Sequence, residues 1–225
     1  MVAGLIVAGA DLLASAQLPA PDAATYRILP SSRFEVRTGT AGLLGFAGHS
    51  HVVRARSFAG SVRYRAGDPS AARVDVVVRA DSLEVLTPHD PAEIRQVTAT
   101  MRDHVLHVAE YPDIRFTLTH ATPTRTGVRL DGELTLAGRT RPVQVDATVQ
   151  AGADTLRARG TFGVNQTEFG IEPYRGGPGG TVRVADRVTF DFDAVAVREA
   201  AAVGASRSAE RGDAATRAAP DGGER

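Results

Sequence analysis

The chain has 225 residues, with 26 basic and 26 acidic side chains, and therefore a formal net charge of zero. This balance argues against a nucleic-acid-binding protein, because phosphate binding requires an excess of positive charge. The absence of cysteine excludes disulfides, thiolate metal sites and a cysteine nucleophile. A hydrophobic content of 43% with 23% charged residues is typical of a globular domain.

The N-terminal residues 1–23 contain a short apolar run followed by Ala14-Ser15-Ala16, which is typical of a signal-peptide cleavage site. The run has no basic residues before it, and Asp11 interrupts it. We interpret this segment as a signal peptide or a disordered N-terminus. It predicts a periplasmic or secreted protein and leaves a cytoplasmic location open. The run is too short to span a bilayer, so we expect no stable membrane insertion.

The C-terminal residues 198–225 are rich in alanine, glycine, arginine and acidic residues and contain almost no large apolar side chain. Such a segment cannot bury enough surface to offset the entropy lost on ordering, so it predicts a disordered tail. The folded domain is therefore expected over residues 24–197.

Alternation of apolar and polar residues dominates this domain. Between Arg73 and Arg79, for example, Val74, Val76 and Val78 share one face while charged residues occupy the other. Such a pattern predicts a strand with one buried face. Turn signals such as Ala137-Gly138-Arg139 join the strands, which indicates an all-β antiparallel meander closed as a barrel or stacked as a sandwich. The same alternation recurs at residues 114–119, 128–136, 143–150, 156–162 and 188–193.

Residues 51–65 also alternate, but the outward face changes part of the way along. Arg54 and Arg56 share one parity, whereas Arg63 and Arg65 share the other. The change is expected around residues 57–61, with a bulge or sharp bend at 59–60, a device that barrels use to turn corners.

One segment departs from the β pattern. Between residues 92 and 109, apolar side chains recur at spacings of three and four, which predicts an amphipathic helix. Asp90 and Pro91 supply an N-cap and a first-turn proline, and Tyr111-Pro112 is expected to stop the helix. The predicted helix would cap one end of the barrel. Its apolar stripe consists of Ile94, Val97, Met101, Val105 and Val108.

Several blocks of sequence resemble the YceI-like family in the same order along the chain. The helix end and strand start at residues 101–106 and 111–116, with Tyr111-Pro112-Asp113-Ile114-Arg115-Phe116, are similar to those of its members. The resemblance extends over about residues 25–197. Further similar blocks lie at residues 26–28 and 32–36, 58–62, 134–143 and 186–190.

The resemblance implies a lipocalin-like antiparallel barrel of about eight strands around a long apolar channel. Family members are associated with polyisoprenoids, isoprenoid quinones or other lipid-like molecules, and many are exported to the periplasm. It therefore implies a non-enzymatic protein that binds, carries or sequesters a lipid-like small molecule, with no other cofactor. The expected ligand-binding residues are Phe34, Val36, Phe46, Phe58, Val76, Met101, Phe116, Leu118, Leu136, Phe162 and Phe190.

Four histidines form two closely spaced pairs, His49 with His51 and His104 with His107. In a strand His49 and His51 point the same way, a spacing that suits two imidazoles on one metal ion. On a helical wheel His104 lies near the Met101 stripe and should face inward. An alternative function is therefore a metal- or haem-binding module. The histidines are also explained as polar groups at the barrel mouth that contact a ligand headgroup, which we favour, or as capping and core residues.

No motif of an enzyme is found: the chain has no Gly-x-Ser-x-Gly, no His-Glu-x-x-His and no phosphate-binding loop. A third interpretation is a barrel whose core is filled and whose surface performs the function. The sequence leaves the oligomeric state open between monomer and dimer.

Overall fold

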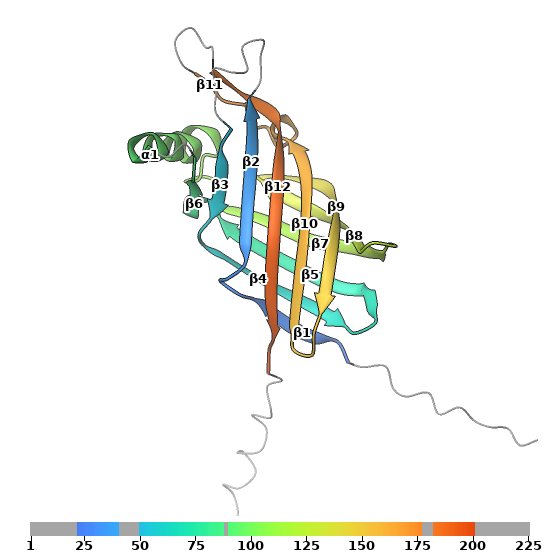
Figure 1. The fold of residues 1–225 in the computed structure, drawn as a ribbon. Coiled ribbons are helices and arrows are strands. Elements are labelled where there is room, and N and C mark those ends of the chain that lie inside the picture. The colour runs from blue at the N-terminus through green and yellow to red at the C-terminus, as the bar shows by residue number, and fades with distance from the viewer. Residues whose placement is uncertain (1–21, 41–49, 88–89, 177–181, 201–225) are drawn as a thin grey trace, which may run out of the picture.

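Nearly all the regular structure is antiparallel β-sheet, with one helix at the side of one end (Figure 1). The computed structural model describes residues 22–40, 50–87, 90–176 and 182–200. Most of the predicted signal peptide and most of the predicted tail lie outside these residues. The strands are β1 (Ala24–Ile28), β2 (Arg33–Thr40), β3 (Val52–Ala55), β4 (Phe58–Arg65), β5 (Asp68–Arg79), β6 (Leu83–Val85), β7 (Asp113–Pro123), β8 (Val128–Leu136), β9 (Arg139–Ala151), β10 (Thr155–Asn165), β11 (Arg175–Gly176) and β12 (Val182–Arg198).

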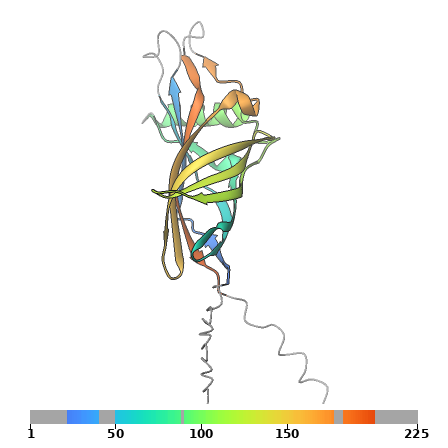
Figure 2. The same ribbon diagram turned by 90° about the vertical axis from the view of Figure 1, so that its right-hand side faces the viewer.

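Eight strands close into a barrel in the order β1-β4-β5-β7-β8-β9-β10-β12, because β12 also pairs with β1. The closing ladder aligns Tyr26 with Arg198 and Ile28 with Ala196. Figures 1 and 2 show β10 and β12 running along the length of the barrel, while β5, β7 and β8 cross it obliquely. The predicted all-β barrel of about eight strands is confirmed.

At three places the chain bends as it passes between the closed ring of strands and the part of the sheet that extends beyond this ring. β1 continues into β2, β3 continues into β4, and β5 continues through the short helix η2 (Ala80–Ser82) into β6. β2 pairs with β12, β3 with β2, and β6 with β3, so these three strands extend the wall beyond the closed ring. The chain bends at Leu29–Ser32, where Leu29 N–H donates to the Val195 carbonyl.

The predicted bend in residues 51–65 is real but lies earlier than expected. Val53 and Ala55 are buried in β3, and the inward parity changes at residues 56–57, between β3 and β4. The proposed site at 59–60 is wrong because Gly60 has a packing role within β4. A Cβ on Gly60 would lie 2.7 Å from Cδ1 of Ile28.

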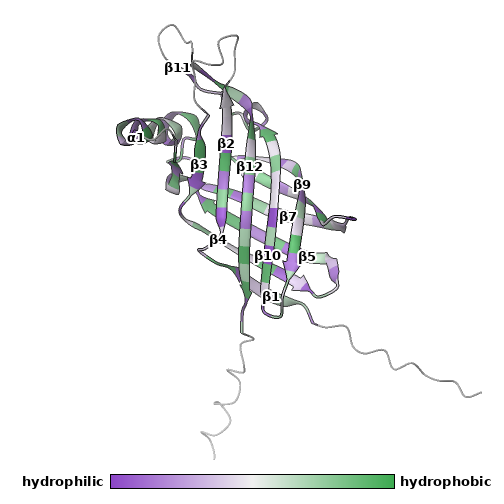
Figure 3. Cartoon of the chain, viewed as in Figure 1, coloured by the Kyte–Doolittle hydropathy of each residue, from purple (hydrophilic) through white to green (hydrophobic). Residues whose placement is uncertain are grey.

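The alternation that predicted the strands is visible along each of them as a change between hydrophobic and hydrophilic colour (Figure 3). The predicted turn at residues 137–139 is a two-residue hairpin joining β8 to β9. Ala137 and Gly138 both have positive φ, 46° and 71°, as the tight hairpin turn with matching twist requires.

The helix begins where the sequence predicts but changes geometry before its predicted end. In α1 (Pro91–Thr100) the Asp90 carboxylate accepts a hydrogen bond of 2.8 Å from Ala92 N–H. A π turn, η3 (Met101–Val105), follows, and His107 then has a φ of 49°. A π turn holds more residues per turn than an α-helix, so later side chains rotate away from the extrapolated stripe. His104, expected to face inward, is therefore exposed.

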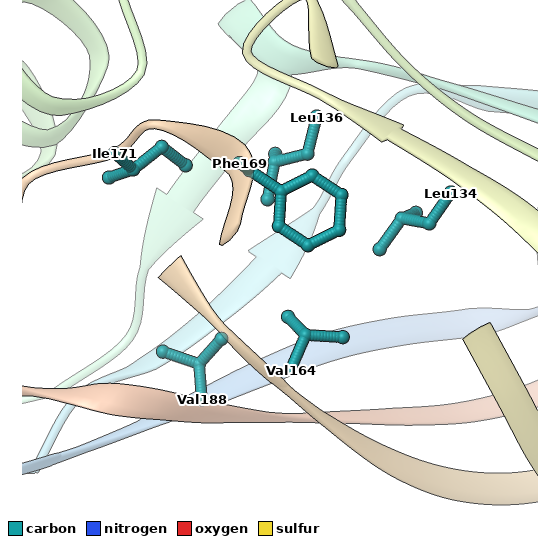
Figure 4. Close-up of a cluster of buried hydrophobic side chains, with 6 residues drawn as sticks. All are labelled: Leu134, Leu136, Val164, Phe169, Ile171 and Val188. Atoms are coloured by element: carbon teal, nitrogen blue, oxygen red, sulfur yellow. The ribbon is translucent and has the colours of Figure 1, made fainter. Parts of the chain in front are cut away.

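A short helix fills the opening in the barrel wall where β9 and β10 no longer pair with each other. These strands pair only as far as Asp146 and Thr161, and η4 (Gln166–Phe169) packs against both and against β12 beyond that point. Arg141 Nε donates to the Glu168 carbonyl and so ties η4 to β9. Phe169 is only 1% exposed and lies at the centre of an apolar cluster (Figure 4). The other members are Leu134, Leu136, Val164, Ile171 and Val188.

The outer wall carries an ordered set of ion pairs. Asp193 on β12 accepts hydrogen bonds from Arg157 at 2.7 and 2.8 Å and from Arg159 at 3.1 Å, both on β10. These two guanidinium groups hold the pKa of the Asp193 carboxyl well below its ordinary value. On β2, Glu35 is almost fully covered and pairs with Arg54 on β3. These ion pairs thus link neighbouring strands, β10 with β12 and β2 with β3, in addition to the backbone hydrogen bonds.

Replacing Phe169 with alanine should lower the free energy of unfolding by about 3–5 kcal/mol, because the ring leaves a cavity inside a packed cluster. Denaturant unfolding followed by circular dichroism measures the change. Val149→Ala is the control, since Val149 is 39% exposed, and it should change the free energy by less than about 1 kcal/mol. Equal effects of the two substitutions would contradict the plugging role of η4.

Replacing Asp193 with asparagine should destabilise the protein at neutral pH and progressively less at acid pH. A carboxyl with a lowered pKa in the folded state stabilises the fold above its unfolded pKa, near 3.8, and loses this effect as pH falls toward the folded value. Thermal unfolding from pH 7 to pH 2 measures the difference between the two proteins. Asp154→Asn, whose partner Arg198 is 4.0 Å away at an exposed site, should show almost no difference.

Candidate functional site

The barrel encloses a cavity of about 770 Å³. Inward-facing side chains of the barrel strands, together with β2, β3, β6 and α1, line it, and most of them are aliphatic or aromatic. This volume lies within the range of about 300–1,000 Å³ that is typical of small-molecule sites, and the apolar lining suits a hydrocarbon. The interpretation as a filled core does not hold for this interior.

Nine of the eleven residues predicted to contact a ligand line this cavity. Phe58 does not line it; its ring packs edge-on against that of the lining residue Phe34, with ring centroids 4.8 Å apart. Phe46 lies outside the described residues. The nine are Phe34, Val36, Val76, Met101, Phe116, Leu118, Leu136, Phe162 and Phe190.

Small inward-facing residues explain why the interior is not filled. An eight-stranded barrel is just wide enough to be filled by its own side chains or to hold one small ligand. Ala158 on β10 and Ala194 on β12 are directly paired, and both line the cavity. At the neighbouring Gly160 the Phe192 ring takes up the space, since a Cβ there would lie 2.7 Å from it, so the two alanines and not this glycine leave room in the interior. The two alanines are not among the predicted contact residues, although the alternation at residues 156–162 places Ala158 on the inward face.

Figure 1 shows α1 beside β3 and β6 at one end of the barrel. The part of the cavity lining that α1 and the neighbouring ends of β2 and β3 contribute includes several polar side chains. Along the inward face of β2 the lining changes from Phe34 and Val36 to Thr38 and Thr40. Far from α1 the lining is apolar and includes the buried Leu118 and Leu156. The cavity therefore has an apolar body and a polar mouth. The polar mouth consists of Thr38, Thr40, His51, Glu93, Gln96 and Thr100.

The helix α1 is bonded to the free edge of β6. Among the described strands β6 pairs with β3 alone, so in this part of the chain no strand lies beside its other edge. Thr98 Oγ1 accepts a hydrogen bond of 3.2 Å from Val85 N–H, and Arg102 donates two, of 2.6 and 2.9 Å, to the Leu83 carbonyl. Thr98 and Arg102 are four residues apart and thus lie on one side of the helix. They replace the missing strand and hold Val97 and Met101 against the cavity.

The two histidine pairs have different surroundings. His51 is half-buried and lines the cavity, and its Nδ1 lies 2.7 Å from the Thr87 carbonyl oxygen. His104 and His107 are exposed and do not line the cavity, and His49 lies outside the described residues. Within the described part of the chain, no three or more His, Asp or Glu side chains come together as a metal site would require. Of the three proposed metal ligands that lie in the described ranges, His51 alone lines the cavity.

Across the described ranges, no helix has both the length and the apolar character needed to cross a membrane.

The fold and the cavity define a class of protein: a closed, eight-stranded antiparallel barrel that encloses an apolar cavity with a polar mouth. The sequence profile of the YceI-like domain matches residues 30–196. The chain therefore belongs to the YceI-like family, which confirms the resemblance seen in the sequence. No protein of curated function matches the chain.

Solved structures share the fold at low sequence identity. BcnA of Burkholderia cenocepacia is 17% identical, with a TM-score of 0.57 over 72% of this chain and 95% of its own. A polyisoprenoid binding domain from Saccharophagus degradans, implicated in plant cell wall breakdown, is 12% identical with a TM-score of 0.54, covering 79% of this chain and all of that one. The Campylobacter jejuni YceI protein is 15% identical with a TM-score of 0.50, covering 66% and 85%.

Replacing Thr98 with valine should lower the free energy of unfolding by about 1–3 kcal/mol, because it leaves the Val85 N–H without its acceptor. The Val85 amide should also exchange faster with solvent deuterons. Hydrogen exchange and denaturant unfolding measure the two effects. Thr98→Ser keeps the hydroxyl and should retain slow exchange, whereas slow exchange in the valine variant would contradict the role of Thr98 at this edge.

Proposed function

We propose that this protein binds a lipid-like molecule of the isoprenoid type inside the barrel, and that it carries or sequesters this ligand without chemical change. The observation that carries the proposal is the enclosed cavity of about 770 Å³ with its apolar body and polar mouth. An amphipathic molecule with a long hydrocarbon tail and a small headgroup matches this distribution of polarity.

The energetics of burial favour such a ligand. Each methylene transferred from water to an apolar site contributes about 0.8 kcal/mol, so about twenty carbons contribute roughly 16 kcal/mol before costs. The loss of translational and rotational freedom, with ordering of the tail, removes several kcal/mol of this. A tail of this length does not need full enclosure to bind tightly.

The comparisons support an isoprenoid in particular. The family match extends over residues 30–196, and a structural neighbour is described as a polyisoprenoid binding domain. Binding rather than catalysis is proposed because hydrocarbon side chains, which cannot transfer protons, make up most of the lining. The ligand-contact role of the nine lining residues named above is part of the same proposal.

Native mass spectrometry of protein purified without detergent, combined with lipid extraction, tests the proposal. The expected result is a stoichiometric apolar adduct or, for ligand-free protein, one-to-one binding of added farnesol. A bare protein that also fails to take up farnesol would contradict the proposal.

Replacing Ala158 with phenylalanine should reduce farnesol binding at least tenfold, because the added ring occupies the space opposite Ala194 inside the cavity. Thr148→Phe is the matched control: it adds the same ring on the neighbouring strand β9 at an exposed position. The control should bind as the unmodified protein does. Circular dichroism checks that both variants fold, and equal loss of binding in both would contradict a ligand site inside the barrel.

A further inference from the structure

His51 lies on the inward face of the wall at the polar mouth. It continues the inward alternation of Val53 and Ala55 on β3, and all three line the cavity. Its backbone makes two hydrogen bonds to Thr38 on β2, because Thr38 N–H donates to the His51 carbonyl and His51 N–H donates to Thr38 Oγ1. The imidazole is therefore attached to a fixed part of the wall.

The hydrogen bond to Thr87 determines which ring nitrogen carries the proton. Nδ1 of His51 is 2.7 Å from the Thr87 carbonyl oxygen, which can only accept, so Nδ1 must be the donor. In the neutral ring Nε2 is then an acceptor, and it is the nitrogen left for a ligand. Thr87 is itself fixed, since its hydroxyl accepts from Val52 N–H at 3.0 Å and donates to the Ser50 carbonyl at 3.2 Å.

The charges at the mouth do not favour an anionic headgroup. Glu93 is the carboxylate that α1 contributes to the lining. Among the described residues, Arg115 and Arg183 are the arginines that reach the lining, and both are exposed. Arg115 alternates with the inward-facing Ile114 and Phe116 and pairs with Asp113. Arg183 alternates with Val184, and this alternation directs both arginine side chains toward the outer side of the wall. The cavity side of the mouth thus presents acceptors, amide and hydroxyl groups.

We infer that His51 selects a headgroup with a neutral hydroxyl, such as an isoprenoid alcohol or a phenol, through a hydrogen bond from that hydroxyl to Nε2. The inference rests on the proposed function, since it assigns the polar end of the same ligand. Glu93 adds to the selection by repelling phosphorylated headgroups. Because the bond to Thr87 leaves Nε2 as an acceptor, Nε2 can form a hydrogen bond with a hydroxyl headgroup but not with an ether, which has no proton to donate.

Competition in native mass spectrometry between farnesol and farnesyl methyl ether tests the inference. The two probes share the tail and differ in one donor. A net hydrogen bond of about 0.5–1.5 kcal/mol predicts that the unmodified protein prefers farnesol roughly three- to tenfold. Farnesyl diphosphate should compete more weakly than farnesol.

The variant His51→Asn supplies the matched control. Its amide nitrogen lies close to the position of Nδ1 and can still donate to the Thr87 carbonyl, while nothing replaces Nε2. This variant should bind both probes with no preference. Glu93→Gln should keep the preference for farnesol over the ether and strengthen the binding of farnesyl diphosphate.

The outcomes separate the inference from the function on which it rests. Equal binding of alcohol and ether by the unmodified protein, a preference that survives in His51→Asn, or tighter binding of the diphosphate than of farnesol would overturn the inference alone. If the unmodified protein binds neither farnesol nor the ether, the proposed function and the inference are overturned together.

Discussion

The pairing of β1 with β12 closes the sheet, and the cavity depends on this closure. In a closed ladder every strand has a neighbour on both sides, so backbone hydrogen bonds hold the wall and no edge is left exposed within the ring. The interior does not have to be filled to keep the strands together. Small residues such as Ala158 and Ala194 can then face inward and leave space, whereas an open sheet would need a packed core on that face.

Side chains complete the wall where the backbone ladder ends. On one side Thr98 and Arg102 bond α1 to the free edge of β6, and on the other Phe169 fills the wall where β9 and β10 separate. One helix lies beside a strand edge and the other lies where two strands separate, and both contribute to the apolar clusters around the cavity. Both also reach the cavity lining, through Val97 of α1 and Gln166 of η4.

The sequence predicted the strands and their inward faces well, because burial on one side imposes a period of two that is visible in composition alone. Eight of the nine predicted contact residues that line the cavity lie on strands and face inward for this reason, and the ninth, Met101, lies in η3. The prediction failed where geometry departs from a regular period. The π turn after Thr100 places His104 on the exposed side. Gly60, expected in the bend, packs against Ile28 within β4, and the bend lies at residues 56–57. Whether the alanines leave space or are covered by larger neighbours depends on cross-strand register, which one sequence does not display. The hydrogen bond from His51 to Thr87, 36 residues apart, depends on the same register.

The proposed function requires the barrel to hold an amphipathic chain with its tail in the apolar body and its headgroup at the mouth. A crystal structure of the protein grown with farnesol tests it most directly. The account predicts continuous electron density between Ala158 and Phe34, with the hydroxyl within hydrogen-bond distance of His51 Nε2. Lining side chains that close the cavity, or farnesol found only on the outer wall, would contradict it.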